Sequence, residues 1–343
     1  MALVTPVTEK QESEAAGPAS AASGGARPFA SFIVCTRDRV KLLVACIRSI
    51  ETTCLAHPAI ASELIVVDNG STDGTHAELR RIAAASKVPM TLVPEPRQGL
   101  AVARNTGMER ARGRIFVFID DDCVVDRAYL GDLKRHYQSG DGVIRGGRVE
   151  LGNPNDLPFT IKRSKAAARL TPDVHPGGFV LGCNMTMDRE VALRVGCFDE
   201  RFGVGAPLCS AEDTEYLVRA YALGIPVEYV PDMTVFHHHG RRARAAIEKL
   251  HRSYSLGNGA LCLKHLVKAP WLVKHFLWTV RSACLESFGG ARFDPALQLS
   301  HWPVVAMNLL GAARFLCLFI VGRAAPTALQ PMSEVAPKQE RGP

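Results

Sequence analysis

The feature that most constrains the fold of this chain is an alternation of short, continuously apolar stretches with segments of helical periodicity, which starts near residue 29. The apolar stretches read FASFIVC, ELIVVD, VPMTLVPE and RIFVFID, and helical segments such as DRVKLLVACIRSIETTC separate them. Strands that are apolar throughout are typical of a parallel sheet covered by helices on both faces. The sequence therefore predicts an α/β fold built around such a sheet.

Acidic residues follow the predicted strands. Asp38 comes just after the first strand, Asp68 ends the second, and Asp120, Asp121 and Asp122 follow the fourth. Open α/β sheets bind their ligands beyond the carboxyl ends of the strands. We therefore expect these acids to lie along one edge of the sheet and to face a ligand.

The three consecutive aspartates need a compensating charge, because adjacent carboxylates repel one another and are unfavourable beside a core of low dielectric constant. One interpretation is a solvated turn that caps a helix starting near Asp126. The position at the ligand-binding edge favours another, a divalent cation. Carboxylates at positions i and i+2 can face one hard ion, such as Mg²⁺ or Mn²⁺, which in turn bridges to phosphate oxygens.

Missing motifs narrow the choice of ligand. No G-x-G-x-x-G follows the first strand, which argues against a nicotinamide dinucleotide, and the absence of G-x-x-x-x-G-K-S/T excludes a P-loop. The turn NGSTDG after the second strand supplies a helix cap, yet it leaves the Asp68 carboxylate able to accept the N–H of a nucleobase. The net charge of +7 suits an anionic partner without choosing among nucleotide, phospholipid headgroup and nucleic acid.

The N-terminal segment and the cysteines indicate the cellular compartment of the protein. The first 28 residues are rich in Ala, Ser, Gly and Pro and contain no apolar signal core, so we expect 1–28 to be a disordered tail. The ten cysteines include no C-x-x-C pair, which argues against zinc ribbons and redox dithiols. Scattered cysteines among apolar neighbours are typical of reduced, buried thiols in a cytosolic protein.

The chain changes character at Arg241, where a basic helical segment begins. Residues 270–288 have the composition of a helix at a membrane interface, and residues 303–322 are about long enough to span a bilayer. A buried helix packed on the rest of the protein is equally compatible with 303–322. We expect a helical, membrane-associating region at 241–325 that is separable from the preceding domain, and a flexible tail at 326–343.

Six segments together resemble the pattern of family 2 glycosyltransferases with the GT-A fold. In chain order they are FIVCTRDRVKLL, ELIVVDNGSTDGT, RQGLAVARNTGMERARGRIFVFIDDDCVVD, GCNMTM, VGCFDERFGVG and AEDTEYLVRAYALGIPVEYVPDMTVFHHH. The resemblance covers residues 29–240 and is specific to the family, although not to a sugar. It implies a Rossmann-like mixed sheet flanked by helices.

The resemblance implies roles for individual residues. Those that match the nucleotide-sugar site are Thr36, Arg37, Asp38, Asp68, Arg104, Asn105, Asp120 and Asp121, with Asp68 at the position that reads a uracil-type base. Those that match the metal site are Asp120 and Asp122, which form the D-x-D pair, and His237. Asp213 matches the catalytic base and Glu212 is its neighbour; taken alone, this pair could equally stabilise the first turn of a helix through its dipole.

The expected function follows from the resemblance. It implies an inverting glycosyltransferase, dependent on Mn²⁺ or Mg²⁺, that moves a sugar from a UDP-sugar to a hydroxyl of a lipid-linked or cell-surface glycan precursor, as in polysaccharide biosynthesis. Nucleic acid is not an expected partner, and the expected location is the inner face of the plasma membrane. A sugar-phosphate nucleotidyltransferase is an alternative, although CTRDRV lacks the glycine-rich loop of such enzymes. A non-catalytic module that binds nucleotide sugars is another.

Overall fold

The computed structural model describes residues 27–138, 140 and 142–321. The predicted tails at 1–28 and 326–343 lie outside this part of the chain, apart from residues 27 and 28. Its strands are β1 (Ala30–Thr36), β2 (Ser62–Asp68), β3 (Met90–Pro94), β4 (Ile115–Asp120), β5 (Cys123–Val125), β6 (Ile144–Leu151), β7 (Ala168–Arg169), β8 (Asn184–Asp188) and β9 (Val227–His237). Its helices are α1 (Val40–Ala56), α2 (Thr75–Ala85), α3 (Leu100–Arg110), α4 (Tyr129–His136), α5 (Arg189–Val195), α6 (Glu212–Ala222), α7 (Arg244–Lys264), α8 (Leu272–Ser287) and α9 (His301–Ile320).

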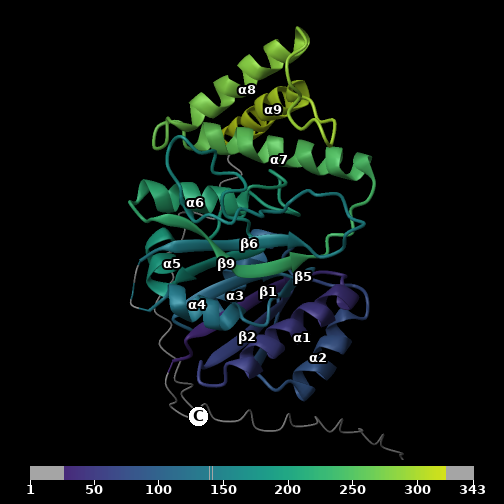
Figure 1. Ribbon diagram of the computed structural model, residues 1–343, viewed down its shortest axis with the longest axis vertical. Coiled ribbons are helices and arrows are strands. Elements are labelled where there is room, and N and C mark those ends of the chain that lie inside the picture. Colours follow the sequence, from purple (N-terminus) through teal and green to yellow (C-terminus); the bar gives the residue numbers. More distant parts are fainter. Residues whose placement is uncertain (1–26, 139, 141, 322–343) are drawn as a thin grey trace, which may run out of the picture.

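The described strands form one mixed sheet in the order β3-β2-β1-β4-β8-β6-β9-β5, and β7 pairs with β9 (Figure 1). The first four strands are parallel, as the apolar stretches predict. β8 runs antiparallel to β4, because it enters the sheet where β4 ends and pairs Asn184 with Ile119. The parallel arrangement predicted for the first four strands is therefore confirmed, and so is the mixed sheet implied by the family resemblance.

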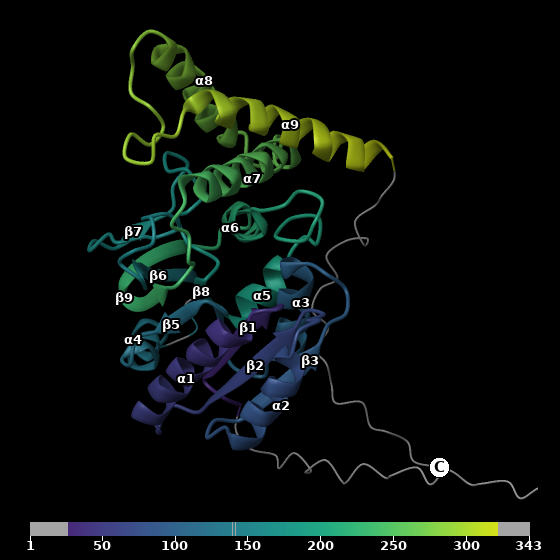
Figure 2. The same ribbon diagram turned by 90° about the vertical axis from the view of Figure 1, so that its right-hand side faces the viewer.

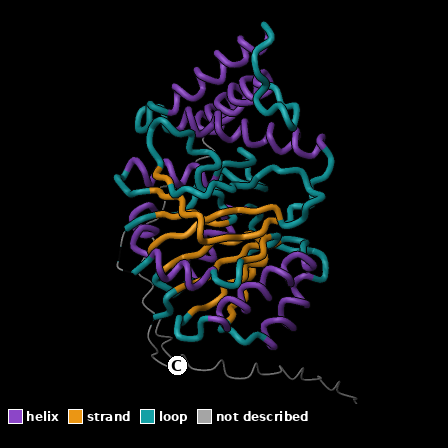
Figure 3. Tube along the Cα trace, in the orientation of Figure 1, coloured by secondary structure: helices purple, strands orange, loops and turns teal. Residues whose placement is uncertain are grey.

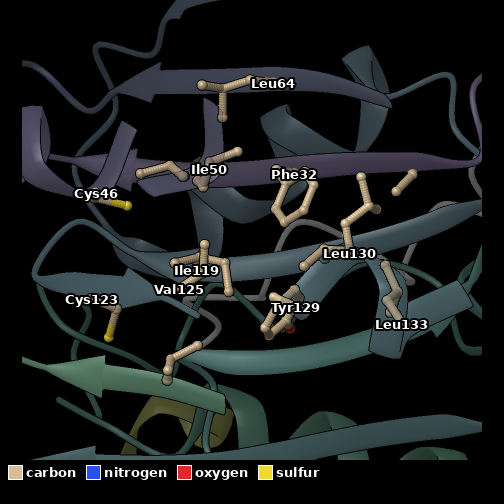
Figure 4. Packing of buried hydrophobic residues seen from close by; sticks show 14 of the residues in the cluster. Phe32, Cys46, Ile50, Leu64, Ile119, Cys123, Val125, Tyr129, Leu130 and Leu133 are labelled. Carbon is tan, nitrogen blue, oxygen red and sulfur yellow. The ribbon is translucent and has the colours of Figure 1, made fainter. Parts of the chain in front are cut away.

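Both faces of the sheet are covered by helices (Figure 3), so the strands carry apolar side chains on each side. Along β1, Phe32 and Val34 belong to a core shared with α1 and α4, and Figure 4 shows Phe32 among the side chains of that core. Ile33 belongs to the opposite core, shared with α3, α5 and α6. This double burial explains why the strands are apolar at every position.

The last three helices form a layer beyond α6, on the side away from α1 and α2 (Figure 2). α9 crosses α7 at two glycines: a methyl group on Gly259 would overlap the backbone of Asn308, and one on Gly311 would overlap that of Leu256. α9 has a mean hydropathy of 1.9 and is long and apolar enough to cross a membrane, while 17% of that window is buried inside the protein. One side of α9 is thus packed on α7 and the other presents apolar side chains.

α7 is joined to the preceding region by a shared core and by buried ion pairs. Phe202 and Val218 pack in one cluster with Ala260 and Leu261 of α7. Glu215 of α6 is fully buried and accepts hydrogen bonds from Arg219, Lys264 and His265. Lys264 also contacts Asp199, with 2.5 Å between Nζ and Oδ2. These contacts argue against the expectation that the region before Arg241 folds without the C-terminal helices.

We predict that a chain ending at Gly240 is strongly destabilised. It loses Lys264 and His265, and removing partners of a buried charge costs roughly 3–5 kcal/mol. Because about 1 kcal/mol moves the unfolding midpoint by about 2–4 °C in a domain of this size, the midpoint should fall by about 6–20 °C, or the chain should aggregate. Thermal unfolding followed by circular dichroism measures this. A chain ending at Val321 is the control, and equal midpoints for the two chains would contradict the prediction.

Candidate active site

A large cavity of about 1450 Å³ lies between the carboxyl ends of the central strands and the C-terminal helices. The sheet register brings the aspartate cluster to its floor, because β1 pairs Cys35, which lines the cavity, with Asp120. On its other side β1 pairs Thr36 with Asp68, which lies outside the lining. The predicted site residues that line the cavity are Thr36, Arg37, Arg104, Asp120, Asp121, Asp122, Glu212, Asp213 and His237. Residues from five separate stretches of the sequence therefore meet at one surface.

The three aspartates are compensated by cations of the protein itself. Asp120 accepts a hydrogen bond from Arg104 at 3.1 Å, and Asp121 accepts one from Thr36 at 2.7 Å. Arg39 extends Nη1 between the other two carboxylates, 3.2 Å from Asp121 and 3.1 Å from Asp122. Each carboxylate thus has a positively charged neighbour from a different part of the chain.

Asp122 and His237 form a buried pair, with 3.2 Å between Oδ1 and Nε2. Burial by itself raises the pKa of the Asp122 carboxyl, but the hydrogen bond and charge of His237 outweigh it and lower that pKa to about 2. Burial likewise favours neutral His237, yet its bond to Asp122 raises the pKa of the imidazole to about 9. By contrast, burial raises the pKa of Asp121 to about 6, in spite of Thr36 and Arg39.

His237 also lies near two buried thiols. Donor atoms of His237, Cys123 and Cys183 lie within 4.8 Å of one another, which makes a compact group of metal-type donors. Soft thiolate ligands select ions such as Zn²⁺, whereas carboxylate oxygens suit Mn²⁺ and Mg²⁺. The carboxylates of Asp120 and Asp122, which line the cavity together with His237, are the donors suited to a hard ion.

Arg104 connects the aspartates to the opposite wall. Its side chain is 3% exposed, and its two terminal nitrogens bind Asp120 at 3.1 Å and Glu212 at 3.0 Å. The guanidinium also lies over the rings of Phe118 and Phe198, 6.0 Å and 5.6 Å from their centroids. Burial disfavours the charged form, but the surrounding carboxylates raise the pKa of Arg104 well above its usual range. It is a fixed cation between two acidic groups.

Glu212 and Asp213 open α6 and face the cavity from that wall. The backbone before them is constrained, since Ala211 has a left-handed φ of 68° and Ser210 donates a hydrogen bond to the Ser253 carbonyl of α7 at 2.8 Å. Asp213 accepts the N–H of Gly182 at 2.9 Å. Burial and the charge of Asp213 raise the pKa of Glu212 to about 7, in spite of Arg104.

Three predicted site residues do not line the cavity. Asp38 accepts the backbone N–H groups of residues 72 and 73, which lowers the pKa of its carboxyl. Asp68 accepts the N–H of Ser71 at 3.0 Å and contacts His76 at 3.2 Å. Asn105 exchanges two hydrogen bonds with the backbone of Phe198. All three hold loops around the cavity in place.

Two arginines that line the cavity, Arg39 and Arg241, are not among the site residues implied by the resemblance. Arg39 lies two residues beyond the predicted Arg37, and nothing in the local sequence distinguishes these two. Arg241 lowers the pKa of Asp122, and its Nη1 is a buried atom without a hydrogen-bond partner among the described residues. A signal for Arg241 exists in the sequence, because it directly follows the segment HHHG that contains His237.

A mixed sheet with an acidic cluster at its strand ends defines the GT-A class of transferase folds. The model of glycosyl transferase family 2 matches residues 31–195, which supports a family 2 glycosyltransferase. It is 28% identical to glycosyltransferase AglE of Haloferax volcanii over 236 residues, which cover 68% of this chain and 73% of the relative. The chain is thus a glycosyltransferase, as the resemblance implied, and the nucleotidyltransferase and non-catalytic alternatives are not retained.

Two solved structures share the fold at low sequence identity. The mannosyltransferase PcManGT from Pyrobaculum calidifontis, solved with GDP-Man and Mn²⁺, superposes with a TM-score of 0.58 and 20% identity, covering 85% of this chain and 88% of that one. TarS from S. aureus superposes with a TM-score of 0.55 and 17% identity, covering 72% of this chain and 42% of that one.

The raised pKa of Glu212 predicts a pH-dependent stability difference. The pKa rises from an ordinary value of 4.5 to about 7 on folding, so the native state binds more protons than the unfolded state between these values. The stability of the protein should therefore fall as pH rises through this window, and Glu212→Gln should remove that contribution. Unfolding midpoints at pH 5 and pH 8 test this. The midpoint of Glu212→Gln, relative to that of the wild type, should be higher at pH 8 than at pH 5.

The matched control is Glu228→Gln. Glu228 is also paired with an arginine, Arg145, at 3.0 Å, but it lies outside the cavity. Subtracting its effect corrects for the loss of an arginine-paired glutamate. A difference between wild type and Glu212→Gln that stays constant with pH would contradict the prediction.

Proposed function

We propose that the chain transfers a sugar, with inversion, from a nucleoside diphosphate sugar to an acceptor hydroxyl, and that a divalent metal ion assists. The observation that carries this proposal is the facing arrangement of two acidic groups across one cavity. Asp120, Asp121 and Asp122 lie on the sheet edge, and Asp213 lies on the opposite wall at the start of α6. A donor between them has its diphosphate on one side and its anomeric carbon toward the other.

The donor set fits Mn²⁺ or Mg²⁺. Asp120 and Asp122 supply carboxylate oxygens two residues apart, which hard cations prefer, and His237 stands beside Asp122. When bound, such an ion stabilises the negative charge that develops on the departing diphosphate. The fold neighbour PcManGT was solved with GDP-Man and Mn²⁺, and GalNAc-T7, with a TM-score of 0.50, was solved with UDP, GalNAc and Mn²⁺.

Cationic side chains of the protein contribute to donor binding in addition to the metal ion. Arg39 and Arg241 line the cavity beside Asp122, and the Nη1 atom of Arg241 has no partner among the described residues. We assign these two arginines to the donor diphosphate, because guanidinium groups bind phosphate oxygens in a bidentate manner. Thr36 and Arg37 line the adjacent part of the cavity and are assigned to the nucleoside.

The predicted nucleotide residues outside the lining keep a supporting role in this proposal. Asp38 and Asp68 fix the turn at residues 71–73, which borders the nucleoside end of the cavity. Asn105 ties α3 to the loop at Phe198 and so positions Arg104 from the next residue in the helix. Uridine as the nucleoside rests on the match of Asp68 to the family pattern.

The opposite wall of the cavity supplies the general base for the transfer step. Asp213 removes the proton of the acceptor hydroxyl, whose oxygen forms a bond to the anomeric carbon. The bond from that carbon to the diphosphate oxygen breaks, and its electron pair leaves with the nucleoside diphosphate. The Gly182 N–H donates a hydrogen bond of 2.9 Å to the Asp213 carboxylate and so fixes its position. Arg104 forms its ion pair with the neighbouring Glu212 and not with Asp213. Attack from the side opposite to the leaving group inverts the anomeric centre.

We infer that the enzyme works at a membrane surface, at the cytoplasmic face, on a lipid-linked or cell-surface glycan precursor. The outer side of the C-terminal layer is apolar, with Phe288 at 91% exposure and Phe319 at 71%. Exposed apolar patches of this kind mark membrane or protein contacts. Because α9 packs on α7 along its other side, we place it in the membrane interface, parallel to the surface.

Asp122→Ala should abolish the metal-dependent part of donor binding. Calorimetric titration of a UDP-sugar with and without Mn²⁺ measures this, and the wild type should bind more tightly with the ion. The control is Asp232→Ala, which also breaks an aspartate–histidine pair of 3.2 Å, with His136, but outside the cavity. Unchanged, Mn²⁺-dependent affinity in Asp122→Ala would remove this residue from the metal site.

Asp213→Asn should slow transfer by about 10²- to 10⁴-fold, the range expected for the loss of a general base. Donor affinity should persist, because Asn keeps the hydrogen bond from Gly182 and the donor is bound from the sheet edge. Transfer rate and donor affinity are measured side by side. The control is Asp173→Asn, a carboxylate that also lines the cavity but pairs with Lys274. Near-normal transfer by Asp213→Asn would move the base to another residue, with Glu212 as the first candidate.

A further inference from the structure

Two buried thiols and an imidazole lie together beside the aspartate cluster. Donor atoms of Cys123, Cys183 and His237 lie within 4.8 Å of one another, and all three residues are buried. Cys123, labelled in Figure 4, opens β5, Cys183 directly precedes β8, and His237 ends β9. Because these residues are far apart in the sequence, the spacing of the cysteines does not reveal the group that the fold assembles.

Strand pairing fixes the positions of these donors. β5 pairs antiparallel with β9, and Cys123 lies directly opposite His237 in that register. Side chains of directly opposite residues project from the same face of a sheet. Cys183 is held by its neighbour Asn184, which pairs with Ile119 of β4. Donors carried by paired strands need little rearrangement to close on an ion.

The imidazole of His237 is oriented as a metal ligand. Its Nδ1 atom lies 3.3 Å from the backbone carbonyl oxygen of Thr160. A carbonyl oxygen only accepts hydrogen bonds, so Nδ1 carries a hydrogen and Nε2 is the atom available to a metal. Such a carbonyl partner on the second ring nitrogen is usual for histidines that bind metals. Nε2 lies 3.2 Å from Asp122 Oδ1, which is 3.9 Å from the Cys123 sulfur.

The separations between the donors suit a tetrahedral zinc ion. Bonds of about 2.3 Å to sulfur and about 2.0 Å to nitrogen or oxygen, at tetrahedral angles, place the ligand atoms roughly 3.3–3.8 Å apart. The two distances from Asp122 Oδ1, 3.2 Å and 3.9 Å, lie at the limits of this range. The other donors lie within 4.8 Å of one another, so closure on the ion requires movements of roughly 1–1.5 Å or less. Cys183 and His237 line the cavity, which gives an ion its route of entry.

The charge of the donor set also favours zinc over the hard ions. Two thiolates neutralise a dication, so the buried group gains no net charge from them and the ion together. As the ion binds, each thiol releases its proton to solvent and its sulfur forms a bond to the metal, while no electron is transferred. Thiolates select Zn²⁺, whereas Mn²⁺ and Mg²⁺ prefer oxygen ligands.

We propose that Cys123, Cys183 and His237, with Asp122 as the fourth ligand, bind Zn²⁺, and that this ion excludes the catalytic metal. Both ions need Asp122, and both draw on His237, so they cannot be bound in full at the same time. Zinc is then an inhibitor of donor binding and not the ion of the transfer step. The zinc site stands on the geometry of its donors alone, whereas its effect on the donor rests on the proposed function.

The first test titrates Co²⁺, a spectroscopic substitute for Zn²⁺, into the full-length protein, kept reduced and freed of metal with a chelator. Thiolate-bound Co²⁺ in a tetrahedral site has intense visible bands and thiolate charge-transfer bands, whereas Co²⁺ held by carboxylates lacks the latter. The wild type should show the thiolate bands, and Zn²⁺, which has a filled d shell, should abolish them by displacing Co²⁺. Cys183→Ser should weaken Co²⁺ binding by at least about 10- to 100-fold, the loss typical of residues that only orient a metal ligand.

The matched control is Cys35→Ser. Cys35 is another thiol that lines the cavity, but it lies outside the group of donors, so this variant should keep the thiolate bands. Circular dichroism checks that both variants are folded, and Cys183→Ala takes the place of Cys183→Ser if the latter is not.

The second test measures the competition between the two ions. A UDP-sugar is titrated calorimetrically in the presence of Mn²⁺, with and without one equivalent of Zn²⁺. Zinc should remove the Mn²⁺-dependent part of donor affinity in the wild type and in Cys35→Ser. Cys183→Ser should keep that part, because it no longer retains Zn²⁺ beside His237.

Absence of thiolate bands in the wild type would overturn the inference and leave Cys123 and Cys183 as packing residues of the core to which they belong. Bands of equal strength in Cys183→Ser would overturn it as well. Mn²⁺-dependent donor affinity that persists with Zn²⁺ bound would overturn the competition between the ions. A wild type that shows the thiolate bands but binds no UDP-sugar would retain the zinc site and defeat only the proposed transferase function.

Discussion

The site depends on one buried cation, Arg104. Its guanidinium joins Asp120, at the end of β4, to Glu212, at the start of α6, and so connects the two acidic walls of the cavity. Without this charge, Asp120, Glu212 and Asp213 would repel one another across a space of low dielectric constant. The distance between the donor side and the proposed base is thus set by two ion pairs from a single side chain, held from behind by Phe118 and Phe198.

The charge of three consecutive aspartates can be compensated in two ways, by the protein itself and by a bound ion. Their negative charge is balanced by Arg39, Arg104 and His237, so the chain itself supplies counter-charges for the cluster. In the proposed reaction a metal ion and a diphosphate would bring opposite charges to the same place, and the half-exposed Arg39 would then turn toward the phosphate oxygens while Arg104 stays fixed. The protein therefore carries exchangeable counter-charges for a substrate that is both cationic and anionic.

The sequence predicted the first four strands well because burial on both faces makes them apolar throughout. It did not predict β5 or β7, which are three and two residues long and leave no periodic pattern. Nor did the sequence show that Arg104 lines the cavity whereas Asn105 does not. Adjacent residues on a helix point to different sides, and only the tertiary fold shows which side faces the cavity. Arg39 was missed for a related reason: its partners lie more than eighty residues away.

The glycine contacts between α7 and α9 have a mechanical consequence. Where Gly259 and Gly311 bring two backbones together, no side chain lies between them that could change rotamer, so the two helices can neither slide nor rotate past each other. α7 is fixed in turn to the start of α6 through Gly257, whose added methyl group would meet Ser210 and Ala211. Rearrangement that widens the cavity thus falls to α8 and the loop after it, while the proposed base keeps a constant distance from α7 and α9.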